Sequence, residues 1–564
     1  MGDWRNICLG RTIVGEGYAD QPYILKTDDG AWLCSVTLSG LIEGSKDQHV
    51  ATFRSVDKGC TWEKEVRLEQ KDAVENSYSV MLKVPGGRIY IFYIRNSDNV
   101  RQIPYHDDRT KFFTRVDSLG HYVFRYSDDH GRSWSHDYYD IPVREYKCDR
   151  DNAFQGKIRF FWNVGKPFVL DGRVYLPLSK VGQMGNGFYQ QSEGALLMSD
   201  NLLTEKDPFK INWLTLPDGD VGLRTPPGGG SISEEHSYVT LSDGSICASY
   251  RSIDGYSVES YSRDGGHTWT TPHYKLLASG NPAKNPRAAN FIWKMNDGRY
   301  LYWFHNHGGH FVRESFEKHR RPNPFYGRNP VWLCGGVEKD TSEGKVISWL
   351  EPRVFLYDVV KSSRISYPDF LEDDGNLYFS ETQKSIARVH QVPKEYIEGL
   401  FTDVNPVTIA HCSGGTCEMP PLPRFRPEFG DRGEQEPRQA LHFRVELNDD
   451  APDVWFDAMN SSGLGFKVAF TADRRIALQW NEPERRMMID SQVLPQKVSS
   501  AEIIIDNGSG IVYFRCNGMF CDGGEERQFG WQFYDDYMQG LDWAKEIRLG
   551  KNVANFEIGQ EIFQ

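Results

Sequence analysis

The chain has 564 residues, which is long for a single domain, so two or more domains are expected. Its formal net charge of −13 argues against nucleic acid or an anionic membrane surface as a partner. Aromatic residues make up 13% of the chain, which fits the interior of β-sheets and also the stacking of rings on sugars. Short β-rich runs separated by Asp-Gly turns predominate, so the predicted class is all-β.

The N-terminal residues contain no apolar core of a signal peptide. We therefore expect either a cytoplasmic protein or a secreted or periplasmic one whose leader has been removed. The ten cysteines are too few for a disulfide scaffold, and unpaired thiols are favoured. The spacing of Cys412/Cys417 and of Cys516/Cys521 leaves open a local disulfide or a pair of metal ligands. The sequence predicts no metal and no cofactor.

Six hairpins are predicted along residues 1–405, each entering a glycine turn and returning as an apolar strand. The intervals between them leave room for a four-stranded unit and its loops. Six such units in a row are typical of a β-propeller, in which radial repetition leaves few open sheet edges. The return halves are residues 29–33, 86–90, 171–175, 243–247, 297–301 and 374–378.

A second repeat follows the first, second and fourth hairpins and fits the pattern S-x-D-x-G-x-x-W. Its copies are residues 55–62, 127–134 and 262–269. The Ser and Asp side chains can bond backbone N–H groups within a turn, and Gly takes a conformation that other residues resist. The Trp can anchor the turn on the next strand. The motif therefore predicts the same turn where the third strand of a unit ends.

The rest of the chain has a different organisation. Residues 406–435 are predicted to be a Pro-rich linker, because proline makes such segments extended and semi-rigid. Residues 436–564 alternate polar and apolar side chains with a period of two. This alternation predicts an antiparallel β-sandwich of the jelly-roll, lectin-like kind, resembling concanavalin, as an accessory domain.

The three motif copies resemble the Asp boxes, or BNR repeats, of the sialidase superfamily. The resemblance covers about residues 10–400. It implies a six-bladed catalytic propeller and an enzyme that removes a terminal sugar from a glycan. In that superfamily the Asp box lies at the periphery, so the motif identifies the fold rather than the chemistry.

The first residues of each inner strand are expected to line the central funnel of such a propeller. In all six units these residues are polar or charged and precede an apolar strand. Together they predict a polar pocket. Its candidate members from the inner strands are Asp20, Glu75, Asn163, Lys166, Glu235, Arg287 and Asp369, and Arg224 is expected on a glycine-rich rim loop.

The resemblance also implies roles for particular residues. Tyr367 matches the element that carries the nucleophilic Tyr of exo-sialidases, and Glu235 matches the element that carries its Glu partner. Arg251 matches the second of three arginines that hold the substrate carboxylate, and Arg287 is the candidate for the third. A phenol needs a carboxylate to accept its proton, and a nearby Arg is expected to lower the phenol pKa further.

Two positions depart from the sialidase pattern. Asp20 stands where the first carboxylate-binding Arg is expected, and it should repel an anionic sugar and accept hydrogen bonds from hydroxyls. His49 stands at the place of the acid/base Asp and is competent for proton transfer near neutral pH. A slip of one or two residues would align Asp47 there instead.

We therefore predict an exo-acting glycoside hydrolase acting on an oligosaccharide or polysaccharide, with a substrate other than sialic acid expected. Its catalytic candidates are Tyr367, Glu235, His49 and Asp20, or alternatively paired carboxylates among Asp20, Glu75, Glu235 and Asp369. One alternative is a polysaccharide lyase, because a His/Tyr pair with Arg suits β-elimination from a uronate. A second alternative is a non-catalytic carbohydrate-binding protein.

Overall fold

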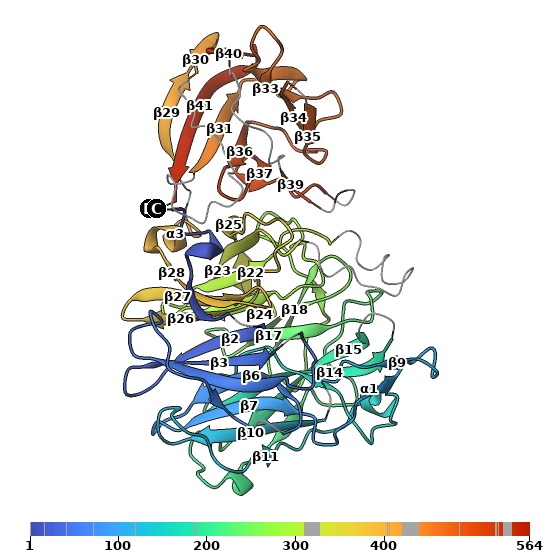
Figure 1. Ribbon diagram of the computed structural model, residues 1–564. Coiled ribbons are helices and arrows are strands. Elements are labelled where there is room, and N and C mark those ends of the chain that lie inside the picture. Colours follow the sequence, from blue (N-terminus) through green and yellow to red (C-terminus); the bar gives the residue numbers. More distant parts are fainter. Residues whose placement is uncertain are drawn as a thin grey trace. The chain divides into compact units, whose positions relative to one another are not determined.

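The computed structural model is almost entirely β-structure (Figure 1). It describes residues 2–15, 17–40, 42–70, 73–118, 120–185, 189–309, 327–402, 404, 406–419, 439–483, 486–524, 527, 529–533 and 544–563. The chain divides into two compact units. The larger unit comprises Gly10–Leu350 and Ser362–Glu398, and the smaller comprises Met1–Leu9, Glu351–Lys361 and Gly399–Gln564.

The first half of the larger unit forms three antiparallel sheets. Sheet 1 consists of β2 (Tyr18–Lys26), β3 (Trp32–Ser39), β4 (His49–Ser55) and β5 (Val66–Arg67). Sheet 2 consists of β6 (Asn76–Lys83), β7 (Ile89–Arg95), β10 (His121–Ser127) and β11 (Tyr139–Asp140). Sheet 3 consists of β12 (Phe161–Trp162), β13 (Phe168–Leu170), β14 (Arg173–Met184), β15 (Tyr189–Ser199) and β16 (Leu214–Leu216).

The second half forms three more. Sheet 4 consists of β17 (Glu234–Thr240), β18 (Ile246–Arg251), β19 (Ser257–Ser262) and β20 (His273–Tyr274). Sheet 5 contains β21 (Phe291–Lys294), β22 (Tyr300–Phe304), β23 (Val331–Thr341) and β24 (Gly344–Trp349). Sheet 6 consists of β26 (Ser366–Asp373), β27 (Asn376–Thr382), β28 (Ala387–Val392) and β1 (Arg11–Val14).

Short elements occur between the sheets. They are the hairpin β8 (Ile103–Pro104) and β9 (Phe112–Phe113), the helices α1 (Lys147–Arg150) and α3 (Lys394–Glu398), and the 3-10 turns η1 (Ile7–Leu9) and η2 (Pro208–Lys210). No helix in the described ranges is long and apolar enough to cross a membrane.

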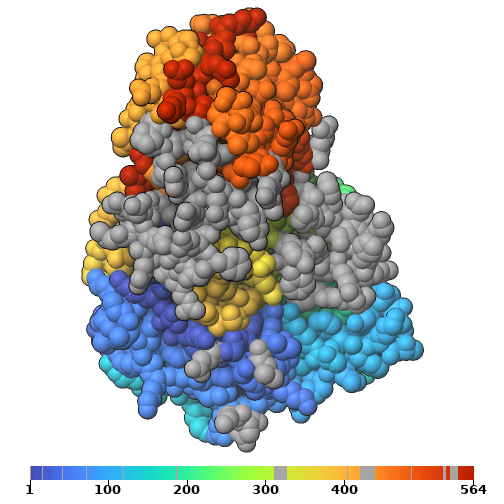
Figure 2. Space-filling model, turned by 45° about the horizontal axis from the view of Figure 1, so that its top comes forward, coloured from blue at the N-terminus to red at the C-terminus, as the bar shows by residue number. Residues whose placement is uncertain are grey.

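The sheets are arranged as a β-propeller, as the hairpin spacing predicts. The inner strand β2 of sheet 1 contacts β6 of sheet 2 and β26 of sheet 6, and β17 contacts β14 and β21. The space-filling view shows sheets 1 and 2, in dark and lighter blue, side by side (Figure 2). The ring is closed by β1, which pairs with β28, so that the first strand of the chain completes the last sheet.

Aromatic side chains fill the interior of the propeller. Trp32, Trp303, Trp332 and Trp349 are among the largest fully buried side chains. Burying an aromatic side chain removes a large apolar area from water, so these residues stabilise the packing of neighbouring sheets. The high aromatic content of the sequence is therefore used in the core to a large extent.

The three copies of the S-x-D-x-G-x-x-W motif form the same turn after β4, β10 and β19. In the third copy, the Gly266 N–H donates to Ser262 Oγ at 2.8 Å, and the Thr268 N–H donates to Asp264 Oδ1 at 2.9 Å. The Thr268 hydroxyl donates to Asp264 Oδ2 at 2.6 Å. The other two copies repeat these bonds with distances of 2.6 to 2.9 Å. In every copy the Ser and Asp side chains thus bond to backbone and hydroxyl groups of the same turn.

The smaller unit contains a β-sandwich of two antiparallel sheets. The first consists of β29 (Val407–Cys412), β41 (Val553–Ile562), β31 (Gln439–Leu447), β36 (Ser500–Asp506), β37 (Ile511–Cys516), β38 (Met519–Phe520) and β39 (Trp531–Phe533). The second consists of β30 (Thr416–Glu418), β40 (Glu546–Leu549), β32 (Asp453–Asp457), β33 (Gly465–Phe470), β34 (Ile476–Asn481) and β35 (Arg486–Asp490). Trp455 and Trp480 are buried in its core.

Two segments distant in sequence from the sandwich belong to the same unit. Arg5, from the N-terminal segment, is buried and forms an ion pair with Asp506 at the end of β36, as well as with Asp3. The strand β25 (Arg353–Leu356) contributes Arg353, which forms an ion pair with Glu561 of β41. These contacts between distant residues have no signature in the sequence.

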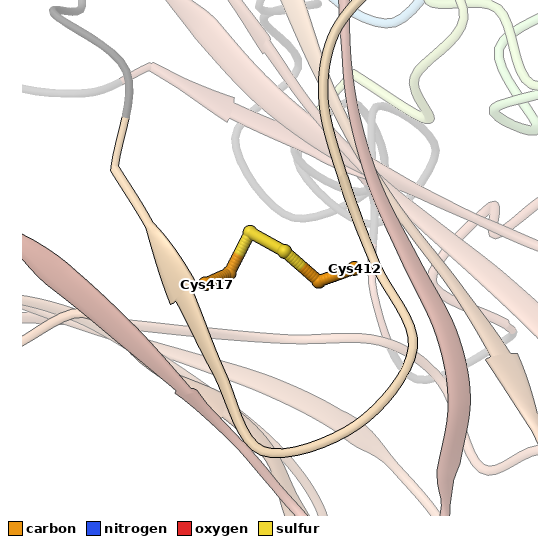
Figure 3. The surroundings of a disulfide bond; sticks show 2 residues. All are labelled: Cys412 and Cys417. Carbon is orange, nitrogen blue, oxygen red and sulfur yellow. A yellow bond between two sulfur atoms is a disulfide. The ribbon is translucent and has the colours of Figure 1, made fainter.

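Two features of residues 406–435 differ from the sequence-based prediction. Residues 407–418 form β29 and β30 rather than a linker, while the Pro-rich run 420–427 lies outside the described residues. Cys412 and Cys417 form a disulfide (Figure 3), so the prediction of unpaired thiols is wrong for this pair. The hairpin between the two strands brings the thiols together. Cys516 and Cys521 are unpaired and buried.

Candidate active site

The inner strands of sheets 1, 2, 4 and 6 carry a β-bulge at the same place. Each strand shifts its register against its neighbour near its N-terminal end, and the first residue of each bulge has a left-handed backbone. These four residues, called the bulge residues below, are Gln21 (φ 55°), Tyr78 (φ 58°), Glu235 (φ 56°) and Tyr367 (φ 48°). A non-glycine residue in this conformation costs of order 1–3 kcal/mol, and bulges often re-aim side chains beside active sites.

Two bulge residues meet directly. The hydroxyl of Tyr367 donates a hydrogen bond to Glu235 Oε1 at 2.6 Å, although the two residues are 132 positions apart. Arg251, at the end of β18, places Nη1 2.8 Å from Glu235 Oε2. All three side chains are buried. The structure therefore brings together the phenol of Tyr367, the carboxylate of Glu235 and the guanidinium of Arg251, which the sequence singled out.

A further cation missed by the sequence reasoning, Arg328, lies beside this pair. It donates to Ser366 Oγ at 2.7 Å, and Ser366 directly precedes Tyr367. Its positive charge acts on both Tyr367 and Glu235. Arg328 lies in the loop that precedes β23, where no spacing or motif distinguishes it from other basic residues.

Burial dominates the ionisation of the pair. It raises the pKa of Glu235, and Arg251 together with the Tyr367 hydrogen bond offsets this only in part. Burial and the neighbouring Glu235 raise the pKa of Tyr367 well above its usual value, despite the opposing charges of Arg251 and Arg328. The arginines do act to lower the phenol pKa, as expected, but burial and Glu235 outweigh them and leave it raised. Tyr367 rests as a neutral phenol whose proton points at Glu235.

Glu234, the residue before Glu235, holds the two arginines predicted to bind a substrate carboxylate. Arg287 Nη2 lies 2.7 Å from Glu234 Oε1, and Arg251 Nη2 lies 2.8 Å from Glu234 Oε2. Burial acts to raise the pKa of Glu234, but Arg287 and Arg251 outweigh it and leave the pKa below its usual value. The Glu234 carboxylate thus forms ion pairs with both guanidiniums that were expected to bind the substrate. The doublet Glu234-Glu235 was the available signal in the sequence.

Asp20 lies in a second cluster around Lys384. Its Oδ2 accepts from the Tyr18 hydroxyl at 2.6 Å and from Lys384 Nζ at 2.5 Å. Burial raises the pKa of Asp20, while Lys384 lowers it in part. The Lys384 ammonium also lies 4.3 Å from the centre of the Tyr367 ring, and the charge of Asp20 acts on Tyr367. The cluster is therefore electrostatically linked to the Tyr367–Glu235 pair.

The loop between β3 and β4 adds another carboxylate, Glu43, to this cluster. Lys384 Nζ lies 3.2 Å from Glu43 Oε1, and Arg115 Nη2 lies 2.9 Å from it. Burial opposes ionisation, but Arg115 and Lys384 outweigh it and hold the pKa of Glu43 below its usual range. Arg115 also binds Asp117 at 2.9 Å, and Asp117 accepts from the bulge residue Tyr78. Sequence reasoning did not identify Glu43, Arg115 or Asp117, because Glu43 meets Arg115 and Lys384 only in the folded chain.

Lys166 and Asp369 pair with each other rather than with Tyr367 or Glu235. Lys166 Nζ lies 2.8 Å from Asp369 Oδ1, and Asp369 Oδ2 accepts from the backbone N–H of Ile24. Burial raises the pKa of Asp369 and Lys166 offsets part of that effect. Asp369 thus links β26 to β2 and to Lys166 in the loop between β12 and β13, which is a structural role.

Three other candidates are also engaged within the protein. Glu75 accepts from Asn96 and pairs with Arg101. Asn163 donates to the Tyr122 hydroxyl, and Arg224 lies 2.8 Å from Glu193. None of these described contacts reaches Tyr367 or Glu235.

His49 begins β4 and is held by its own surroundings. Its Nδ1 lies 2.8 Å from the Asp47 carbonyl oxygen, and its Nε2 lies 3.0 Å from Glu65 Oε1. The Asp47 carboxylate is bound by the Gly40 N–H and the Ser45 hydroxyl. Within the described part of the chain, no hydrogen bond joins His49 or Asp47 to the Tyr367–Glu235 pair. That same portion contains no group of three or more His, Cys, Asp or Glu positioned to hold a metal ion.

The fold defines this protein as a β-propeller. A buried polar cluster lies at the bulges of its inner strands. The chain belongs to the BNR repeat-like domain family, whose profile matches residues 30–379. The match confirms the predicted membership of the BNR-repeat superfamily.

Solved structures similar to this chain include sialidases. The intramolecular trans-sialidase from Ruminococcus gnavus is 14% identical over 72% of this chain and 100% of its own, with a TM-score of 0.45. The Trypanosoma rangeli sialidase is 12% identical over 98% of this chain and 91% of its own, with a TM-score of 0.42. A protein of unknown function from Dyadobacter fermentans is 14% identical, over 68% of this chain and 99% of its own, with a TM-score of 0.42. No curated protein matches the sequence.

Proposed function

We propose that the protein is an exo-acting glycoside hydrolase in which Tyr367 is the nucleophile and Glu235 accepts its proton. The observation that carries the proposal is the 2.6 Å hydrogen bond from the Tyr367 hydroxyl to Glu235 Oε1. A buried phenol with a raised pKa needs such a base at the moment of attack. The strained backbone at both residues further supports a functional role.

In the proposed reaction, Tyr367 Oη attacks the anomeric carbon of a terminal sugar while its proton passes to Glu235. The bond to the leaving oxygen breaks, and an acid of the protein protonates that oxygen. Water then attacks the glycosyl–tyrosine, the acid's conjugate base takes a proton from this water, and Glu235 returns its proton to Tyr367. Two displacements at one carbon retain its configuration.

Asp20 is the proposed acid. Its raised pKa favours the protonated form, which a general acid needs, and its charge is coupled to Tyr367. Lys384 can stabilise the carboxylate that remains after proton transfer, because it already bonds Asp20 Oδ2. His49 is the second candidate for this role, and its ring contacts Glu65 and the Asp47 backbone instead.

The proposed substrate is a neutral terminal sugar rather than a sialic acid. Glu234 already pairs with both Arg251 and Arg287, and Arg251 also pairs with Glu235, so the attraction of these arginines for a substrate carboxylate is reduced. Asp20 also stands at the position where the sialidase pattern has an Arg, so a cation that would hold a substrate carboxylate is missing there. No described contact favours the lyase or the purely sugar-binding alternative, since His49 and Tyr367 do not form the pair that elimination would use.

The test is a panel of aryl glycosides of neutral sugars, a sialic acid and a uronate, with the product anomer followed by NMR. We expect turnover of a neutral glycoside with retained configuration. A 2-fluoro analogue should label Tyr367, detected by mass spectrometry of its peptide. Inversion of configuration, or a label on another residue, would contradict the Tyr367 mechanism. An unsaturated product would identify a lyase.

A further inference from the structure

Gln21 is the bulge residue of sheet 1 and has no role in the reaction proposed above. Its φ of 55° matches the 56° of Glu235 and the 48° of Tyr367, and its strand shifts register at the same place. The same backbone conformation directs a side chain in the same way relative to its own sheet. Gln21 therefore stands, on sheet 1, in the position that Glu235 and Tyr367 occupy on sheets 4 and 6.

The side chain of Gln21 is fully buried, at 0% exposure. Among the described residues, neither its Nε2 nor its Oε1 has a hydrogen-bond partner. A buried amide can make up to four hydrogen bonds, and burying it without partners is unfavourable. Gln21 thus combines a strained backbone with an unsatisfied amide. Both features are unfavourable to folding, so packing alone does not explain this residue.

Gln48 provides an internal comparison. It is also a buried glutamine and directly precedes β4 of the same sheet, but both the nitrogen and the oxygen of its amide have partners. Its Nε2 donates to Ser77 Oγ at 2.6 Å, and its Oε1 accepts from the Gly44 N–H at 2.5 Å. The protein therefore satisfies the amide of Gln48 with its own groups, whereas the amide of Gln21 has no hydrogen-bond partner among the described residues.

We propose that Gln21 is a substrate-binding residue whose amide pairs with hydroxyl groups of a neutral sugar. An amide offers a donor and an acceptor side by side, which suits adjacent hydroxyls, each able to donate and to accept. Gln21 follows Asp20 directly, so the sugar would contact it beside the proposed acid. This assignment rests on the proposed function, which identifies the site as one that binds a sugar. It adds that the sugar presents hydroxyl groups to Gln21 of sheet 1.

Gln21→Met tests the assignment, because methionine has a similar length and no amide. Without sugar, the melting temperature should stay equal to that of the wild type or rise, since an unsatisfied buried amide is removed. On the glycoside that is turned over, kcat/KM should fall roughly tenfold to a hundredfold. The matched control Gln48→Met should lower the melting temperature, because it breaks two hydrogen bonds. If Gln21→Met instead behaves like Gln48→Met and leaves kcat/KM unchanged, the assignment is overturned.

Deoxy analogues keep the test decisive where Gln21→Met lowers stability as well. For one monodeoxy glycoside, the wild-type kcat/KM should be lower than for the full sugar. That decrease should equal the decrease that Gln21→Met causes on the full sugar. The variant should lose nothing further with that analogue, since both changes remove the same bond. Additive losses for every monodeoxy analogue would overturn the assignment.

A binding measurement separates this assignment from the proposed function. The thermal shift of the wild type and of Gln21→Met is measured with free glucose, galactose, mannose, fucose, rhamnose, glucuronate and N-acetylneuraminate. If a neutral sugar stabilises only the wild type and no glycoside is hydrolysed, the proposed hydrolase fails and the assignment of Gln21 stands. If a glycoside is hydrolysed equally by both proteins, the hydrolase stands and the assignment fails. If no sugar binds and none is turned over, the assignment also fails.

Discussion

The motif turns and the strand bulges are both repeated within the propeller, and they differ in what is repeated. The three S-x-D-x-G-x-x-W turns share their side chains, and in each turn the Ser and Asp side chains bond groups of the same turn. The four bulges share a backbone conformation, whereas their residues are Gln, Tyr, Glu and Tyr. Repeated side chains thus accompany a structural element, and repeated geometry with different side chains accompanies the candidate site. Substitutions in the two regions should therefore separate activity from stability.

The largest effect is expected at a bulge, from Tyr367→Phe. Loss of the nucleophilic oxygen should reduce kcat by about 10³-fold or more on the most active glycoside. Only one hydroxyl is removed and Arg251 continues to hold Glu235, so the melting temperature should change by a few degrees at most. Steady-state kinetics and thermal unfolding measure the two quantities. Wild-type turnover by this variant would remove Tyr367 from the mechanism.

Asp20→Asn is expected to reduce kcat by about 10² to 10⁴-fold on glycosides with poor leaving groups. The loss should shrink on p-nitrophenyl glycosides, because a good leaving group needs little protonation. His49→Ala serves as the comparison in the same assays and should retain most of the activity on both kinds of substrate. The reverse result, with a leaving-group dependence for His49→Ala alone, would assign the acid role to His49.

Glu234→Gln tests the charge balance beside the bulge of sheet 4. It leaves Arg251 and Arg287 with an uncompensated buried charge, so the free energy of unfolding should fall by about 3–5 kcal/mol at neutral pH. The pKa of Glu234 is lowered in the folded state, so its contribution is present above the ordinary value of 4.5. That contribution disappears as the pH falls through the lowered pKa. Denaturant unfolding at several pH values should show the gap between wild type and variant closing below pH 4.5. A gap independent of pH would contradict the ionised state of Glu234.

The smallest effect is expected at a motif turn, from Asp264→Ala. The substitution removes the bonds from the Thr268 N–H and hydroxyl, which lie in an exposed turn. The free energy of unfolding should fall by about 1–2 kcal/mol, and kcat should stay within twofold of the wild type. Denaturant unfolding and kinetics on the same glycoside measure both. A large loss of activity with unchanged stability would erase the contrast between turns and bulges.

Much of the propeller could be predicted from the sequence because its signals are local. A glycine turn and the alternation of apolar residues act within a few positions, so the hairpins and the motif turns are recognisable along the chain. The same reasoning failed for residues 407–418, where exposed polar residues and a nearby Pro-rich run obscure two strands held by a disulfide.

The candidate site was accessible from the sequence only where a family resemblance supplied the partners. Tyr367 and Glu235 were paired on that basis, and the structure places them in hydrogen-bond contact. Lys384, Glu43 and Arg115 were missed, because each is defined by contacts with residues on other sheets. Gln21 was missed for a different reason, since a left-handed bulge in a polar stretch has no residue signature unless it contains glycine.

The sequence by itself determined the all-β class, the repeated hairpins and the turns that separate the strands, because these depend on interactions between neighbouring residues. The tertiary structure alone decided which charges neutralise one another and in which direction the pKa values move. Arg251 was expected to lower the pKa of Tyr367, yet burial outweighs it. Desolvation depends on everything packed around a group, and that environment is assembled from residues hundreds of positions apart.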